Sequence, residues 1–226
     1  MTSDKSIIFD ASSLISLSMN GLYDELRNLK KNFDGHFIIP KEVKLEVVDN
    51  PLQIKKFKLE ALNINALLDE KVIELPECLG ITEKEVSKKS SELLDNANST
   101  FKEKDRIIHI LDLGETSCIA LSKILTERGI KNIVAVDERT TRMLCEKPEN
   151  LKKLLCKKLH TKIDFNKEKT KQFQGIKIVR SCELIYFANK KNLTKLQGKK
   201  ALEAFLYALK SKGCSISFEE IEEMIK

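Results

Sequence analysis

Short apolar segments rich in β-branched residues alternate along this chain with segments of helical periodicity, and this alternation constrains the fold most strongly. The short segments lie at residues 7–9, 36–39, 72–75, 133–136 and 176–179. The helical spacing after the first of them is carried by five leucines, namely Leu14, Leu17, Leu22, Leu26 and Leu29. Strands that alternate with helices favour a parallel sheet covered on both faces. The sequence therefore predicts an α/β fold, a sandwich of helices around a central, mainly parallel sheet of about five strands, with additional helices.

The length of 226 residues suffices for one large domain with an appendage. We expect this domain to span residues 1–190, with insertions at about 76–105 and 147–174. Thr82 and Glu85 have the spacing of a capping box at the start of a helix in the first insertion. Residues 191–226 are expected to form a C-terminal helical extension.

The net charge of +6 is distributed unevenly. Residues 147–212 contain 18 Lys or Arg against 5 Asp or Glu, whereas residues 1–146 contain 21 against 25. An acidic front and a basic rear suit an enzyme that holds metal with one part and phosphates with the other. A solvated, Lys-rich surface explains the same distribution equally well.

Several classes of protein are disfavoured by what the sequence lacks. No segment approaches the ~20 apolar residues of a membrane span, and the run Ile7 to Phe9 is too short for a signal peptide. The six cysteines form no C-x-x-C pair, and three histidines provide no zinc-ligand spacing. No G-x-G-x-x-G follows the first strand, and there is no Walker A pattern. We expect a reduced, cytoplasmic protein that is not a dinucleotide-binding enzyme.

Two acidic residues stand directly after apolar strands, Asp10 after the first and Asp137 after the fourth. In an open parallel sheet, ligands bind outside the carboxyl ends of the strands. Glu46, in the helix after the second strand, and Glu115, in the first turn of a later helix, are placed to reach the same edge. Converging carboxylates repel one another unless cations neutralise them, and oxygen ligands suit Mg²⁺ or Mn²⁺. These acids are therefore candidate ligands of such an ion.

Each acid also has an ordinary structural explanation. Asp10 and Asp137 are suited to cap the helices that follow them. Glu115 suits the positive end of a helix dipole, and Glu46 suits the solvent face of an amphipathic helix. The ordinary explanation is weakest for Asp10 and Asp137, because each of them ends an apolar strand.

Four segments resemble, in order, the motifs of the PIN-domain family. The segment IIFDASSLISL resembles its opening strand, Asp, turn and helix, and IIPKEVKLEVV resembles the segment with the second acid. The segment LDLGETSCIALSK resembles the Gly-Glu form of the third motif, and IVAVDERTTRML resembles the fourth motif. The segment GIKIVRSCELI lies where the family usually has a strand followed by Gly-Thr. The order and approximate spacing agree over roughly residues 5 to 190.

The resemblance implies a PIN-like α/β/α sandwich with one set of catalytic acids that also bind Mg²⁺ or Mn²⁺. Carried over by position, these acids are Asp10, Glu46, Glu115 and Asp137. Ser12 and Ser181 would support the site with polar contacts. Glu42 and Glu138 lie beside the second and fourth positions, and they compete with Glu46 and Asp137 for those roles.

The resemblance is to VapC-like metal-dependent ribonucleases, here with helical insertions. It implies hydrolysis of RNA phosphodiester bonds by a water that Mg²⁺ or Mn²⁺ activates, in a toxin of a toxin–antitoxin pair or in an RNA-processing enzyme. Arg139, Arg142 and Arg180 are candidate RNA contacts. The expected partners are single-stranded or structured RNA, an antitoxin or other protein, and a second copy in a homodimer. The alternative hypothesis is a non-catalytic PIN-fold module that binds RNA or protein.

Overall fold

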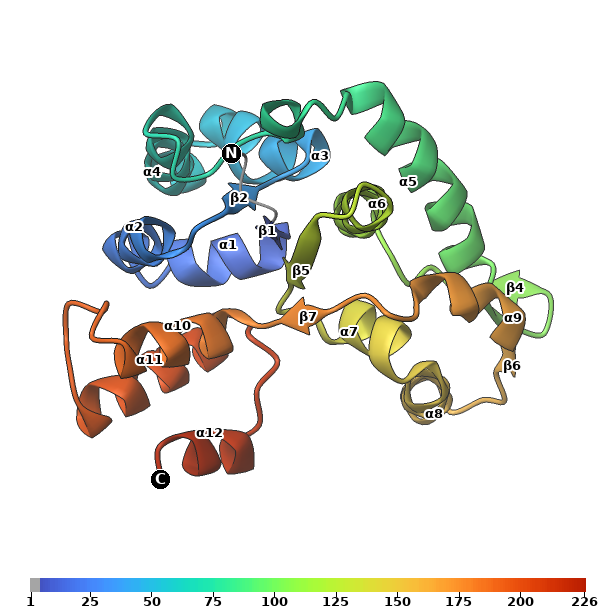
Figure 1. Ribbon diagram of the computed structural model, residues 1–226. Coiled ribbons are helices and arrows are strands. Elements are labelled where there is room, and N and C mark those ends of the chain that lie inside the picture. The colour runs from blue at the N-terminus through green and yellow to red at the C-terminus, as the bar shows by residue number, and fades with distance from the viewer. Residues whose placement is uncertain (1–4) are drawn as a thin grey trace.

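The computed structural model describes residues 5–226, and its centre is a parallel sheet of four strands in the order β2-β1-β5-β7 (Figure 1). The strands are β1 (Lys5–Phe9), β2 (His36–Ile38), β5 (Lys131–Ala135) and β7 (Ile178–Val179). Ile8 of β1 lies in register with Ile38 on one side and with Val134 on the other. The central strand β1 is almost entirely buried after its first residue, as its run of apolar residues predicts.

The prediction of about five strands is wrong by one. Within residues 72–75, Glu74 alone pairs with the sheet, through an isolated parallel bridge to Ile38. Its N–H donates to Phe37 O at 2.8 Å, and its carbonyl accepts from Ile39 N at 3.0 Å. Lys71, with φ +56°, turns the chain just before this segment, and Pro76 starts the turn η4 (Pro76–Leu79) just after it. The segment between the two turns is too short to form a strand with several paired residues, so only one bridge remains.

Helices cover both faces of the sheet, as predicted. Figure 1 shows α1 (Ala11–Ser18), α2 (Tyr23–Asn32), α10 (Ser181–Lys190) and α11 (Lys199–Ser211) on one side of it. On the other side, α6 (Leu113–Glu127) packs against β1 and β5, and α5 (Glu83–Asn98) packs outside α6. Thr82 and Glu85 form the predicted capping box at the start of α5. The strand β5 is followed by α7 (Arg139–Glu146) and α8 (Pro148–Leu159).

The single helical pattern predicted after β1 is divided in the structure. All five of its leucines are buried, so the predicted face is correct. The helix nevertheless ends at Ser18, and Gly21 takes a left-handed φ of +68° before α2 begins at Tyr23. Glycine adopts this conformation without steric cost, which makes it a natural point of division.

The segment after β2 combines several kinds of helical turn. After Pro40 come the α-helix α3 (Lys41–Lys44) and a π-helical turn, η1 (Leu45–Asp49). The 3₁₀ turns η2 (Pro51–Gln53) and η3 (Lys55–Phe57) then lead into α4 (Lys58–Asp69). Regular α-helix therefore resumes only at Lys58. Single π-helical turns are frequent at functional sites, and this one carries Glu46.

The two predicted insertions meet in a second, antiparallel sheet that the sequence analysis did not predict. Its strands, in the order β4-β3-β6, are β3 (Phe101–Glu103), β4 (Arg106–Ile107) and β6 (Asp164–Phe165). Phe101 is fully buried and stacks on Phe165, with ring centroids 5.1 Å apart. The Lys-dense second insertion continues through α9 (Lys167–Thr170) and η5 (Lys171–Phe173). The insertions thus pack against each other through β3 and β6, although the paired residues Phe101 and Phe165 are 64 positions apart in the sequence.

The C-terminal extension packs against the main domain. It contains the helices α11 and α12 (Phe218–Met224), as the expected helical extension requires, and α11 packs on α10. Leu206 and Ile221 are fully buried. Arg180, just before α10, pairs with Glu220 of α12 at 2.9 Å and donates to Ser215 O at 3.1 Å. The extension therefore closes the domain.

All six cysteines are free thiols. Along the described residues 5–226, no helix has the length together with the apolar composition that a membrane span requires.

We expect Arg180→Met to lower the free energy of unfolding by about 1 to 3 kcal/mol, because hydrogen bonds to charged partners are lost from a side chain that is only 8% exposed. Denaturant unfolding measures this change. The matched control is Arg139→Met, at an exposed position, which should stay within about 0.5 kcal/mol of wild type. Equal effects of the two substitutions would contradict a structural role for Arg180.

Candidate active site

Asp10 and Asp137 lie at the carboxyl ends of the paired strands β1 and β5. The strands run in register as far as Phe9 and Ala135, and Asp10 N donates to Ala135 O at 2.9 Å. The side chains are buried, since Asp10 is 3% exposed and Asp137 is fully buried. The parallel pairing brings together two acids that are 127 positions apart in the sequence.

Ser12 connects the two acids. Its Oγ donates to Asp10 Oδ2 at 2.5 Å, and its backbone N donates to the same oxygen at 3.0 Å. The same Oγ accepts from Asp137 N at 3.0 Å. The Ser12 hydroxyl group is therefore a hydrogen-bond donor to the carboxyl group of Asp10 and a hydrogen-bond acceptor for the backbone N–H of Asp137. The hydroxyl group of the next residue, Ser13, donates to the backbone oxygens Asp10 O and Ala135 O, at 2.9 Å each. This shared hydrogen bond holds the ends of β1 and β5 together.

The carboxyl group of Asp137 is held by the first residue of α10. Ser181 N donates to Oδ1 at 2.7 Å, and Ser181 Oγ donates to Oδ2 at 2.6 Å. Both groups are fully buried. The resemblance assigned a supporting role to Ser12 and Ser181, and both do contact these acids.

Glu115 approaches the same region from the first turn of α6. Its Oε2 accepts from Asp112 N at 2.8 Å in a capping box, and its Oε1 accepts from Thr141 Oγ1 at 2.5 Å. Thr141 is 2% exposed and belongs to α7, so it links the third and fourth acidic motifs. Nothing in the sequence marked Thr141, because a Thr in a helix is a common residue with many uses.

Glu46 lies at the solvent-exposed end of the group, on η1. Among the described residues its carboxyl group has no hydrogen-bond or ion-pair partner. A Cβ added at Gly114 would lie 3.0 Å from Glu46 Oε2, closer than the ordinary range of carbon–oxygen contacts. The missing side chain at Gly114 therefore leaves room for Glu46 beside Glu115.

The alternatives Glu42 and Glu138 have different surroundings. Glu138 caps α7, since its Oε2 accepts from Thr141 N at 2.8 Å. Its negative charge raises the pKa of Glu115, so it borders the group of acids. Glu42 is half-buried on α3, and its charge reaches the buried Cys118 thiol below the site. Partial burial and then the charge of Asp10 raise the pKa of Glu46, and this interaction with Asp10 makes Glu46 the stronger candidate for the second position.

The pKa values of the acids reflect their crowding. Burial raises the pKa of Asp10, against the hydrogen bonds from Ser12, and the charge of Asp137 raises it further. Burial raises the pKa of Glu115 to about 8, with added repulsion from Asp10. Partial burial and then the charges of Asp10 and Asp112 raise the pKa of Glu46. Asp10 is therefore the acid that interacts electrostatically with each of the other three.

None of the four acids is neutralised by a cationic side chain within residues 5–226, since none takes part in an ion pair there. Buried carboxylates are normally paired or bound to a metal, because an isolated charge is costly to bury. The acids do not meet as closely as the strictest form of the prediction requires, since no three of their carboxyl groups place oxygens within 4.8 Å of one another across the described residues. The donor set suits a hard divalent cation. If bound, it would be held by Asp10, Glu46 and Glu115, with Asp137 beside them.

The three candidate arginines differ in exposure and in the side-chain contacts that they already make. Arg180 is buried in its ion pairs, and Arg142 Nη1 donates to Ser215 Oγ at 2.9 Å. Arg139 is exposed, and in the described part of the chain it has no side-chain partner. Of the three, Arg139 is therefore the one that can contact a ligand without breaking an internal bond.

A cleft of about 670 Å³ opens beside Asp137, between α7 and the segment 213–217. That segment touches the backbone of Asp137, since Ser215 N donates to the main-chain Asp137 O at 3.2 Å, but none of the four acids lines the cleft itself. The cations that line the cleft are Arg139, Arg142, Lys147 and Lys210, and its acids are Glu146 and Glu220. Glu220 is already paired with Arg180. The lining of the cleft therefore has a positive balance, and the cleft is joined to the acidic group through α7 and the backbone of Asp137.

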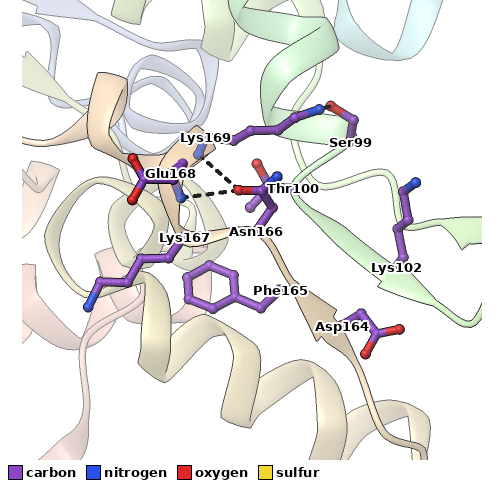
Figure 2. A pocket seen from close by; sticks show the side chains of 9 residues that line it. All are labelled: Ser99, Thr100, Lys102, Asp164, Phe165, Asn166, Lys167, Glu168 and Lys169. Atoms are coloured by element: carbon purple, nitrogen blue, oxygen red, sulfur yellow. Dashed lines mark hydrogen bonds between the residues drawn. The ribbon is translucent and has the colours of Figure 1, made fainter.

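A second hollow, of about 500 Å³, lies over the small sheet (Figure 2). Figure 2 shows Asn166, whose side chain accepts from the backbone of Glu168 and Lys169. Two of the three lysines around it are engaged, since Lys169 donates to Ser99 Oγ at 2.6 Å and Lys167 pairs with Glu149 at 2.9 Å. This hollow has no cluster of reactive groups and is a weaker candidate for a site.

Comparisons with family models, with curated proteins and with solved structures find no match to this chain. The likeness to PIN domains therefore stays a resemblance of sequence motifs.

The raised pKa of Glu115 has a consequence for stability in metal-free buffer. Between the ordinary glutamate pKa of 4.5 and about 8, the unfolded chain loses the proton that the folded chain keeps. Wild type should therefore lose stability relative to Glu115→Gln as the pH rises through this window, and the difference should level off above it. The glutamine side chain accepts one hydrogen bond fewer than the glutamate. This adds to the stability difference between the two proteins a constant part that does not vary with pH. Melting temperatures of both proteins from pH 4 to 9 in EDTA measure the difference, and a constant difference would contradict the shift.

Proposed function

We propose that this chain is a metal-dependent endoribonuclease that hydrolyses RNA phosphodiester bonds with Mg²⁺ or Mn²⁺. The observation that carries the proposal is the group of Asp10, Glu46, Glu115 and Asp137. These acids gather at the carboxyl edge of the sheet, interact electrostatically through Asp10 and have no cationic side chain to neutralise them in residues 5–226. A bound divalent cation supplies two things there, activation of a water and stabilisation of charge on the phosphate oxygens.

Asp10, Glu115 and Glu46 would contribute to ion binding in different ways. Asp10 and Glu115 present carboxylate oxygens whose orientation is set by Ser12 and Thr141. Glu46 has no internal partner among residues 5–226 and can turn toward a ligand. Since burial and repulsion favour the protonated form of Glu115, ion binding should release a proton, as expected for ligands that must be ionised.

The positive cleft beside Asp137 supports a phosphate-bearing substrate. Arg139 and Lys147 line it, and in the described chain neither has a side-chain partner. Contacts of this kind hold the nucleic-acid backbone without selecting a base. The aromatic content of 6% and the absence of Trp disfavour a stacking platform, so backbone contacts should dominate binding. A toxin or an RNA-processing enzyme could both use such a cleft.

Asp10→Asn should reduce the cleavage of labelled RNA by about a hundredfold or more in Mn²⁺, because substitutions even outside the ligand sphere typically cost 10- to 100-fold. The amide keeps the size of the side chain and an oxygen for Ser12, so circular dichroism should show a folded protein. EDTA should abolish cleavage by wild type. The matched control is Glu92→Gln, on the exposed face of α5, which should cleave as wild type does.

Two outcomes of this experiment would contradict the proposal, cleavage that survives EDTA and full activity of Asp10→Asn. RNA binding that persists without any cleavage or Mn²⁺ uptake would instead favour the non-catalytic binding module. In either case, the salt dependence of RNA affinity gives the number of phosphate contacts. The slope of log affinity against log salt concentration is roughly −0.7 per neutralised phosphate for single strands.

Gly114→Ala should displace Glu46 and weaken Mn²⁺ binding by about tenfold. Its effect on stability should be small, because the better helix propensity of alanine, up to about 1 kcal/mol, offsets the crowding. Calorimetric titration of Mn²⁺ measures the affinity. Glu46→Gln should weaken binding similarly, and the double variant should be no worse than Glu46→Gln alone. Additive losses would show that Gly114 acts independently of Glu46.

A further inference from the structure

A second group of ligand-type side chains lies at the opposite edge of the main sheet. His36 is the first residue of β2 and pairs in register with Ser6 near the start of β1, whereas Asp10 and Asp137 follow the last residues of their strands. His36, Glu74 and Cys78 offer one ligand atom each, and these three atoms all lie within 4.8 Å of one another. It is the sole such trio of His, Cys, Asp and Glu across residues 5–226.

We propose that His36, Glu74 and Cys78 bind one divalent cation of the zinc class, at a site separate from the acidic group. Nitrogen and sulfur ligands are those that zinc prefers, whereas Mg²⁺ and Mn²⁺ prefer oxygen. The ligands would be His36 Nδ1, a Glu74 carboxylate oxygen and Cys78 Sγ. A fourth, solvent-facing position would remain for water.

The distances between the ligand atoms are close to those of a zinc site. His36 Nδ1 lies 2.9 Å from Glu74 Oε2 and 3.8 Å from Cys78 Sγ. Tetrahedral zinc with ordinary bond lengths would separate the nitrogen from the oxygen by about 3.4 Å and from the sulfur by about 3.6 Å. Side-chain shifts of a few tenths of an ångström therefore suffice.

The backbone holds each ligand independently of any ion. His36 is placed by the β1–β2 ladder, and Glu74 by its bridge to Ile38. Cys78 lies in η4, where its N–H donates to Leu75 O at 3.1 Å, and Gly80 ends the turn with φ +65°. An ion bound here would fasten η4 to the edge of the sheet, and little ordering of the backbone would oppose its binding.

Lys30 is the competitor for this site. Its Nζ lies 3.1 Å from Glu74 Oε2, and it also donates to Gly35 O at 2.7 Å. In the metal-free chain Lys30 supplies the positive charge that Glu74 faces. Cation binding must displace this ammonium group or share the carboxylate with it. Its removal should therefore favour the ion.

The test uses the full chain, stripped with EDTA and then freed of chelator, in excess Mg²⁺ so that the acidic group is occupied. Titration with Co²⁺ should give a thiolate-to-cobalt charge-transfer absorption that saturates at one equivalent, and Zn²⁺ should abolish it. Carboxylate ligands give no such absorption, so the acidic group cannot produce it. The band should disappear in Cys78→Ser and remain in the matched control Cys156→Ser, a half-buried free thiol on α8.

Two further variants keep the proposal open to refutation if one of them is poorly folded. His36→Gln should weaken Zn²⁺ binding about a hundredfold or more, since it removes a ligand outright. Lys30→Met should strengthen it about two- to fivefold, the usual range for one partly exposed charge pair. Zn²⁺ should raise the melting temperature of wild type but not of Cys78→Ser. Absence of the band in wild type, or its persistence in Cys78→Ser, would overturn the proposal.

Discussion

The burial of carboxyl groups at the ends of β1 and β5 is the constraint on which the rest of the structure depends. Two neighbouring strands that each end in an aspartate bring like charges into a nearly dry environment, where an uncompensated charge is costly. Hydroxyl and backbone donors reduce the cost, above all Ser12, which donates twice to the Asp10 carboxyl group, and Ser181, which donates twice to that of Asp137. They supply no positive charge. Burial therefore keeps the pKa of Asp10 raised, and a cation would complement the site.

The parts outside the central sheet are organised around this edge. The C-terminal extension returns to it, since Ser215 bonds the backbone of Asp137 and is itself held by Arg142 and Arg180. Two of the three candidate arginines, Arg142 and Arg180, therefore stabilise the fold. Positive charge for a ligand is left to side chains of the cleft such as Arg139 and Lys147. Motif positions alone could not separate these two roles, because burial and pairing decide them.

The parallel sheet also separates the two groups of residues that we propose as metal sites. All four strands point the same way, so residues after their last positions gather at one edge and residues at their first positions gather at the other. The carboxyl edge collects hard oxygen ligands. The amino edge, at β2, holds a nitrogen, a sulfur and one carboxylate around His36. Different donor atoms select different cations, so the two proposed sites would differ in the ions that they prefer.

The sequence by itself determined the local elements and the candidate acids. The apolar strands, the buried faces of the helices and the capping box at Thr82 follow from patterns within a few residues, and Asp10 and Asp137 stood out because each ends an apolar strand. Only the tertiary structure decided which segments pair. In the folded protein, residues 72–75 pair with the sheet through a single bridge, and the two insertions pair in a second sheet. Thr141 donates a hydrogen bond to Glu115. It also brought Cys78 to His36 across 42 positions. Such contacts depend on the packing of distant segments, and no local periodicity records them.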